Sequence, residues 1–184
     1  MQKLIISVIG YDRPGIIAAI SRVLFEQGCN IENVTQTILQ SQFAGVFIAS
    51  MPSEFTVESI SRQLEKEMTV MGMQVHLMPF SLQPPCFQGT NSQPFVITTQ
   101  GPDRKGLVAG ITEVIARHGA NVTNLQAVFK GGETPGDNIM IYEVDIPEST
   151  DWQAFNMDLR ERASELNLQI SIQHRNIFEA INRI

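Results

Sequence analysis

Residues 10–33, GYDRPGIIAAISRVLFEQGCNIEN, decide the fold because the chain contains them twice. Residues 101–124 read GPDRKGLVAGITEVIARHGANVTN and repeat the first stretch without a gap, at an offset of 91. Over residues 4–38 and 95–129 the two copies share 11 of 35 residues. Internal similarity at a fixed offset predicts two copies of one structural unit.

The repeat continues through nearly the whole of each half. Beyond residue 43 the offset becomes 95, so that Pro52 matches Pro147 and Gln74 matches Gln169. Residues 81–94 are rich in proline and poor in apolar side chains, which is typical of a linker. We therefore expect a first domain over residues 1–80, a linker over 81–94 and a second domain over 95–175.

Each copy predicts the same order of elements. Short apolar runs indicate first strands at 4–9 and 95–99, and glycines 28 and 119 mark the ends of the helices that follow. These helices carry apolar residues at i, i+4, i+7 and i+8: Ile16, Ile20, Val23 and Leu24, and Leu107, Ile111, Val114 and Ile115.

A hairpin, a second helix and a last strand complete each copy. Their expected ranges are 30–39 with 43–51, 57–71 and 74–80 in the first copy, and 152–166 and 169–174 for the helix and last strand of the second. Thr150 and Gln153 are expected to form a capping box. The order βαββαβ predicts an α+β, ferredoxin-like unit, twice, with the units paired side by side into one antiparallel sheet. Residues 176–184 predict a short amphipathic helix.

Composition excludes several classes of function. The 184 residues include 13 Lys and Arg against 19 Asp and Glu, a net charge of −6, and no basic cluster, so direct nucleic-acid binding is not expected. No apolar stretch is long enough to cross a membrane, and no leader pattern precedes the first strand. Two cysteines cannot form a disulfide framework, and we expect a cytoplasmic protein.

Other uses of this fold do not match the residues. An RNA-recognition module needs aromatic residues on a basic sheet face, a metal carrier needs paired thiolates in the first loop, and an acylphosphatase needs its own phosphate-binding loop. Histidines 76, 118 and 174 are scattered, so no metal and no cofactor is expected. The repeat leaves no room for a catalytic domain and offers no nucleophile–base pair, so we expect no enzyme.

The turns at residues 12–15 and 103–106 are the candidate binding sites. Gly15 and Gly106 allow close approach to the backbone, and the helix N-terminus after each suits a carboxylate. Asp12 and Asp103 can accept a hydrogen bond from an ammonium group. A simpler interpretation stays open, in which the aspartates only cap the helices and the glycines only allow tight packing.

The pattern G-x-D-R-x-G-[IL]-[IV]-A-x-I, followed by G-x-N-[IV]-x-N, resembles the ACT domain, a small ligand-binding regulatory module of amino-acid metabolism. Two units in tandem resemble the glycine cleavage system transcriptional repressor family. The resemblance implies that Asp12, Asn30 and the Gly15 turn contact a bound amino acid. By the repeat it implies the same of Asp103, Asn121 and the Gly106 turn.

The resemblance implies a regulatory protein without catalysis that senses a small, glycine-like amino acid. Its repressor relatives act by contact with a DNA-binding activator, which makes a transcriptional activator the expected protein partner. The alternative is a regulatory subunit of an amino-acid biosynthetic enzyme, with a metabolic enzyme as the partner. A homo-oligomer is left open.

The two turns differ at one position that predicts unequal affinities. Pro14 stands in the first turn where the second has Lys105, and proline at the start of a helix pre-sets the turn. We predict that the Asp12 site binds the amino acid more tightly than the Asp103 site. Calorimetry in which Asp103→Ala abolishes binding while Asp12→Ala leaves it intact would contradict this.

Overall fold

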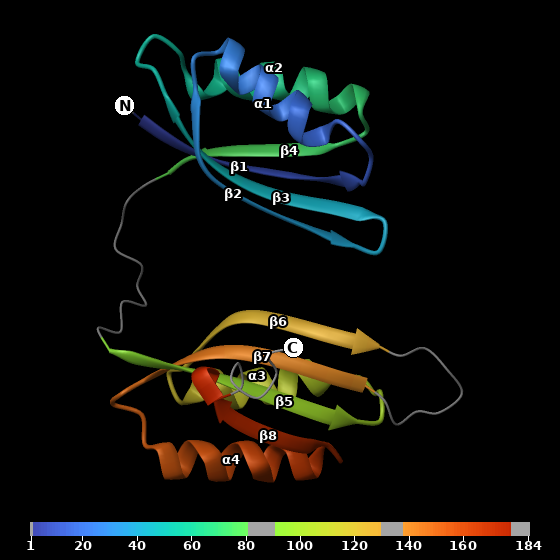
Figure 1. The fold of residues 1–184 in the computed structure, drawn as a ribbon, viewed down its shortest axis with the longest axis vertical. Helices are drawn as coiled ribbons and strands as arrows, with labels where there is room; N and C mark the ends of the chain where they lie inside the picture. Colours follow the sequence, from blue (N-terminus) through green and yellow to red (C-terminus); the bar gives the residue numbers. More distant parts are fainter. Residues whose placement is uncertain (1, 81–90, 130–137, 178–184) are drawn as a thin grey trace. The chain divides into compact units, whose positions relative to one another are not determined.

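The computed structural model describes residues 2–80, 91–129 and 138–177 and divides the chain into two compact units, Met1–Gln83 and Pro84–Ile184. Each unit has the predicted order of elements (Figure 1). The first unit contains β1 (Gln2–Tyr11), α1 (Ile16–Glu26), β2 (Asn30–Leu39), β3 (Gln42–Met51), α2 (Val57–Val70) and β4 (Gln74–Pro79). The second contains β5 (Ser92–Gly101), α3 (Leu107–Arg117), β6 (Asn121–Phe129), β7 (Asn138–Pro147), α4 (Trp152–Glu165) and β8 (Gln169–His174).

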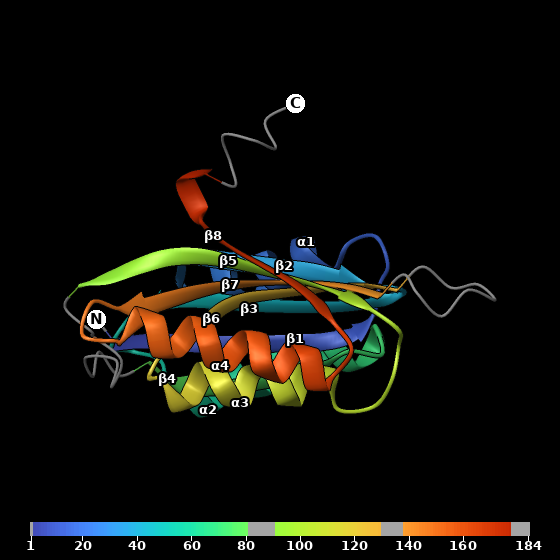
Figure 2. The same cartoon turned by 90° about the horizontal axis from the view of Figure 1, so that it is seen from below.

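The strands of each unit form one antiparallel, four-stranded sheet. The strand order is β2-β3-β1-β4 in the first unit and β6-β7-β5-β8 in the second. Both helices of a unit lie on the same face of its sheet, and Figure 2 shows α3 beside α4. The expected tandem of α+β units is thus confirmed, whereas the joining of the two sheets into one stays a prediction.

Periodicity explains why these residues form these elements. In β1, Leu4, Ile6 and Val8 are fully buried, and the residues between them face the other side of the sheet. The apolar stripes predicted for α1 and α3 are buried against the sheets. Each unit therefore encloses its own hydrophobic core between one sheet face and two helices.

The four helices begin in two different ways. The Thr56 hydroxyl caps α2 by accepting from the Ser59 N–H, and the Asp151 carboxylate caps α4 by accepting from the N–H groups of Gln153 and Ala154. Helices α1 and α3 start instead at a glycine, with no side-chain cap. The capping box expected for Thr150 is wrong because Asp151 lies one residue nearer the helix, and the Thr150 hydroxyl donates to the His118 carbonyl.

The remaining differences concern the ends of elements. Strand β5 begins at Ser92, inside the range expected for the linker. The turn of the first hairpin consists of Gln40 and Ser41, and Gln40 adopts a positive φ of 56°. Residues 175–177 are helical, while residues 81–90 of the linker and 178–184 of the expected C-terminal helix lie outside the described residues.

The Asp151 cap gives a test of the second unit. We predict that Asp151→Ala lowers the free energy of unfolding by about 1 kcal/mol, because two N–H groups of α4 lose their acceptor. Urea denaturation measures the change. The neighbouring variant Ser149→Ala, at an exposed residue outside the cap, is expected to unfold as the wild type does, and equal effects of the two substitutions would contradict the assignment.

Candidate ligand-binding site

A pocket of about 240 Å³ lies at the turn between β1 and α1. Its lining comes from the turn, from the first residues of α1 and from the β2–β3 hairpin: Asp12, Arg13, Gly15, Ile16, Ile17, Ala18, Gln36 and Phe43. Pockets for drug-sized ligands usually enclose about 300–1,000 Å³. The turn pocket therefore has the size for a single small metabolite.

Gly15 is required by its backbone conformation. Its φ is 96°, in the left-handed region that side chains disfavour, and a Cβ added there would meet no atom within 4 Å. Gly106 has a φ of 87° and the same open space. Tight packing is thus not the reason for either glycine, and that part of the simpler interpretation is wrong.

The glycine cap leaves the start of α1 open. The Gly15 carbonyl accepts from the Ala19 N–H at 2.9 Å, so the N–H groups of residues 16–18 precede the first intrahelical hydrogen bond. No side chain caps them, so the part of the simpler interpretation in which Asp12 only caps the helix is also wrong. These N–H groups and the positive end of the helix dipole suit an anion such as a carboxylate.

Each turn is held in place by another element of its own unit. The Asp12 N–H donates to the Ser41 carbonyl at 2.8 Å, which ties the turn to the β2–β3 hairpin. In the second unit, Arg104 donates through Nη2 to the Glu165 carbonyl at 2.9 Å, at the end of α4. A guanidinium near a helix C-terminus interacts favourably with the unpaired carbonyls there, so Arg104 supports the turn structurally.

The structure does not bring Asn30 to Asp12 within one unit. Asn30 pairs with Ser50, which pairs with Lys3 near the start of β1, whereas Asp12 follows the end of β1. Lys3, which is level with Asn30, and Asp12 are nine residues apart along the strand, which is roughly 30 Å of strand length. Asn121 likewise lies level with Pro94, far from Asp103. The contact with the Asp12 pocket implied for Asn30 is therefore not made inside the unit.

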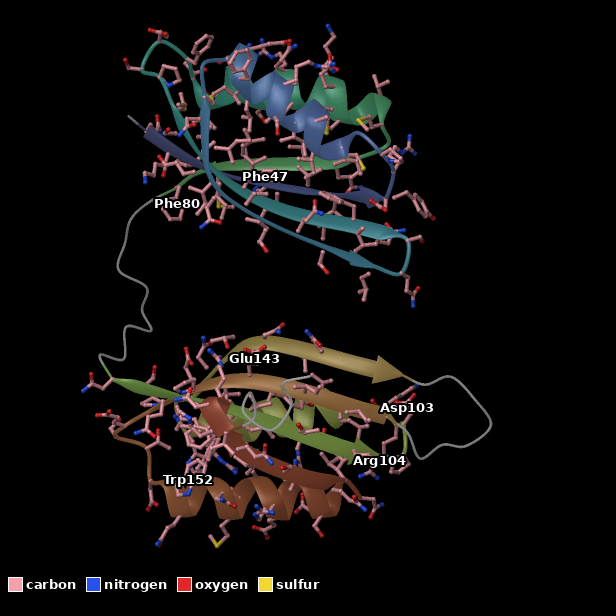
Figure 3. The ribbon with its side chains drawn as sticks, viewed as in Figure 1. Phe47, Phe80, Asp103, Arg104, Glu143 and Trp152 are labelled. Atoms are coloured by element: carbon pink, nitrogen blue, oxygen red, sulfur yellow. The ribbon has the colours of Figure 1, made fainter. Side chains whose placement is uncertain are left out.

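The second unit repeats the turn with a different surrounding. Figure 3 shows Asp103 and Arg104 together between β5 and α3. Behind this turn three positions are polar where the first unit is apolar: Thr99, Asn138 and Tyr142 stand in place of Val8, Phe43 and Phe47. Burial raises the pKa of the Tyr142 hydroxyl to about 12, and the Thr99 hydroxyl opposes the shift.

Sequence reasoning missed two features of the surface. Gln36 and Phe43 reach the turn pocket through strand pairing, which the sequence pattern alone does not give. A pocket of about 480 Å³ lies at the other end of the second unit, beside Phe95 and Trp152, whose rings stack at 4.6 Å. The aromatic residues in this range were its only signal in the sequence.

Within the described ranges, no helix is long and apolar enough to cross a membrane. The same residues contain no group of three or more His, Cys, Asp or Glu side chains that could hold a metal ion.

Comparison with known proteins identifies the family of both units. The family model of the ACT domain matches residues 2–78 and 93–173. A UPF0237 protein of Methanopyrus kandleri is 38% identical over 76 residues, which are 41% of this chain and 84% of that protein. The chain therefore belongs to the ACT domain family, and both of its units are ACT domains.

Two solved structures share the complete two-unit fold. A protein from Galdieria sulphuraria, described as an "unknown protein", is 24% identical, with a TM-score of 0.75 over 94% of this chain and 98% of that one. A protein named "putative glycine cleavage system transcriptional repressor" is 18% identical, with a TM-score of 0.64 over 94% and 96%. ACT domains are regulatory small-ligand-binding domains.

Substitution of Gly15 tests why the turn needs glycine. We predict that Gly15→Ala destabilises the first unit by about 1–2 kcal/mol, because alanine disfavours the left-handed conformation even where space is open. Asparagine tolerates that conformation, so Gly15→Asn is expected to cost less. Thermal denaturation compares the two variants, and an alanine variant as stable as the wild type would contradict the assignment.

Proposed function

We propose that the protein is a non-catalytic sensor of glycine or another small amino acid, which binds in the turn pocket of the first unit. One observation carries the proposal: Asp12 and the first residues of α1, whose N–H groups no side chain caps, line the same pocket. An amino acid carries a carboxylate and an ammonium group on one carbon. The N–H groups suit the carboxylate, and Asp12 suits the ammonium group.

The remaining lining favours a small ligand. Phe43 and Ile16 are each 2% exposed, and they form an apolar inner wall of the pocket beside Asp12 and the start of α1. Gln36 lies at the exposed rim. An inner wall of this kind gives a polar side chain no hydrogen-bond partner, which favours an amino acid with a minimal side chain.

The signal is proposed to pass to another protein. On the sheet face away from the helices, the first unit exposes Ile9, Val46 and Met78, an apolar surface of the kind that marks protein contacts. The solved structure named as a glycine cleavage repressor has the same two-unit fold, which supports a role in transcription of amino-acid metabolism. Ligand binding at the turn would shift the population of the state that contacts the partner.

A thermal-shift screen of the twenty amino acids, followed by calorimetry, tests the proposal. A ligand at about 100 times its Kd adds about 2.7 kcal/mol of stability. At roughly 2–4 °C per kcal/mol, the expected rise in Tm is about 5–11 °C for glycine or a similarly small amino acid. No rise for any of the twenty would contradict a sensor function.

Removal of the Asp12 charge tests the site itself. Asp12→Asn keeps the shape of the side chain but loses the charge that the ammonium group requires, so the affinity is expected to fall at least tenfold. Glu54→Gln, an exposed carboxylate of the same unit outside the pocket, is the matched control and is expected to bind as the wild type does. Unchanged affinity in Asp12→Asn would place the ligand elsewhere.

A further inference from the structure

The second unit places a buried amide where the first unit has an aromatic ring. Phe43 pairs with Gly10 in the first sheet, and Asn138 pairs with Gly101 at the same register in the second. Phe43 lines the turn pocket beside Gly15 and Ile16. Asn138 therefore occupies the corresponding place behind the Gly106 turn and the start of α3.

The oxygen of this amide lacks a partner. Asn138 is 4% exposed, and its Oδ1 accepts no hydrogen bond from any group in the described part of the chain. Asn138, Met140 and Tyr142 alternate with more exposed residues along β7, so the Asn138 side chain is on the face that the helices cover. A buried acceptor without a donor is costly, and native proteins retain such groups rarely.

A second buried polar atom lies on the same face. Thr99 is fully buried where the first unit has Val8, and its hydroxyl lies beside the Tyr142 hydroxyl, whose pKa shift it opposes. Thr99 pairs with Met140, which makes it a diagonal neighbour of Asn138 across the two strands. Tyr142 donates to Met140 Sδ at 3.3 Å. Asn138 Oδ1 thus stands unpaired behind the second turn, with the buried Thr99 hydroxyl as a polar neighbour.

Neighbouring positions change together with Asn138. In the first unit, a Cβ on Gly45 would approach Phe43 Cζ to 2.8 Å, so the ring requires glycine there. The second unit has a buried Met140 at that register, where the pairing with an aromatic ring is absent. Gln36 of the first pocket corresponds to Ala127. The first unit thus has an amide at an exposed strand position near its turn, and the second unit has one at a buried position.

We propose that the turn site of the second unit binds an amino acid whose side chain donates a hydrogen bond, with Asn138 Oδ1 as the acceptor and Thr99 beside it. Serine, threonine, asparagine and glutamine form this class of ligand. The two units then have different specificities, since the first has an apolar inner wall at Phe43. This inference rests on the proposed function, because Asp103 and the start of α3 hold the charged groups shared by all amino acids.

Calorimetry with pairs of similarly sized amino acids tests the specificity in the full chain. The pairs are serine with alanine, threonine with valine, asparagine with leucine and glutamine with methionine. The Asp12→Asn substitution serves as the background, so that the second site dominates binding. At least one donor-bearing amino acid is expected to bind about tenfold or more tightly than its apolar counterpart. Asn138→Leu is expected to abolish that preference.

The unliganded variants give a second readout. Asn138→Leu removes an unpaired buried acceptor with little change of shape, so it is expected to raise Tm by about 2–8 °C. Thr99→Val reproduces the residue of the first unit and is expected to weaken the same preference, which keeps the test valid if Asn138→Leu fails to fold. Gln153→Leu, at an exposed amide in the first turn of α4, is the matched control and is expected to leave the preference unchanged.

Each contrary outcome is distinguishable. A lower Tm in a folded Asn138→Leu variant would show that a buried water or another structural partner already satisfies Oδ1, and would overturn the inference. An unchanged preference in Asn138→Leu and Thr99→Val would do the same. If glycine binds the wild type but none of the four donor-bearing amino acids binds the Asp12→Asn protein, only this inference fails. If no amino acid binds the wild type, the proposed function fails with it.

Discussion

The left-handed glycine before the first helix of each unit is the constraint on which the candidate site depends. With φ of 96° at Gly15 and 87° at Gly106, the chain turns directly from strand into helix, and the capping position carries no side chain. The other two helices are capped by Thr56 and Asp151. Side chains thus accept from the first N–H groups of α2 and α4, whereas no side chain accepts from those of α1 and α3. An uncapped helix N-terminus beside an aspartate is a preformed binding site for a ligand that carries both a carboxylate and an ammonium group.

Repetition preserves this backbone arrangement while the side chains behind it diverge. Both units keep the glycine, the aspartate and the register of the strands. They differ at the inner wall. The first unit has the Phe43 ring over Gly45, and the second unit has the Asn138 amide and Met140 at the same positions. Because an unpaired buried acceptor lowers stability, its retention is easier to explain by a ligand than by packing. A duplicated fold can in this way carry one mode of binding with two specificities.

The sequence predicted the elements well because their signals are local. Helical periodicity and the glycines at the helix ends predicted α1 and α3, and the same pattern occurs in both copies of the repeat. Strand pairing is not local, so the sequence could not show that Gln36 reaches Asp12 while Asn30 lies at the other end of the sheet. The cap of α4 was misassigned because Thr150 and Asp151 are both good capping residues, and only the geometry decides between neighbours. Asn138 was visible as a polar residue, but its meaning depends on burial and on the missing partner.

The central claim is that a ligand carboxylate binds the uncapped N–H groups at the start of α1. Backbone amide NMR during a glycine titration observes these groups directly. The account predicts that the amide signals of Ile16, Ile17 and Ala18 shift most, together with residues of the Asp12 turn, while those of β4 stay in place. Glycine-dependent shifts confined to other surfaces, such as the pocket beside Phe95 and Trp152, with the α1 amides unmoved, would contradict the account.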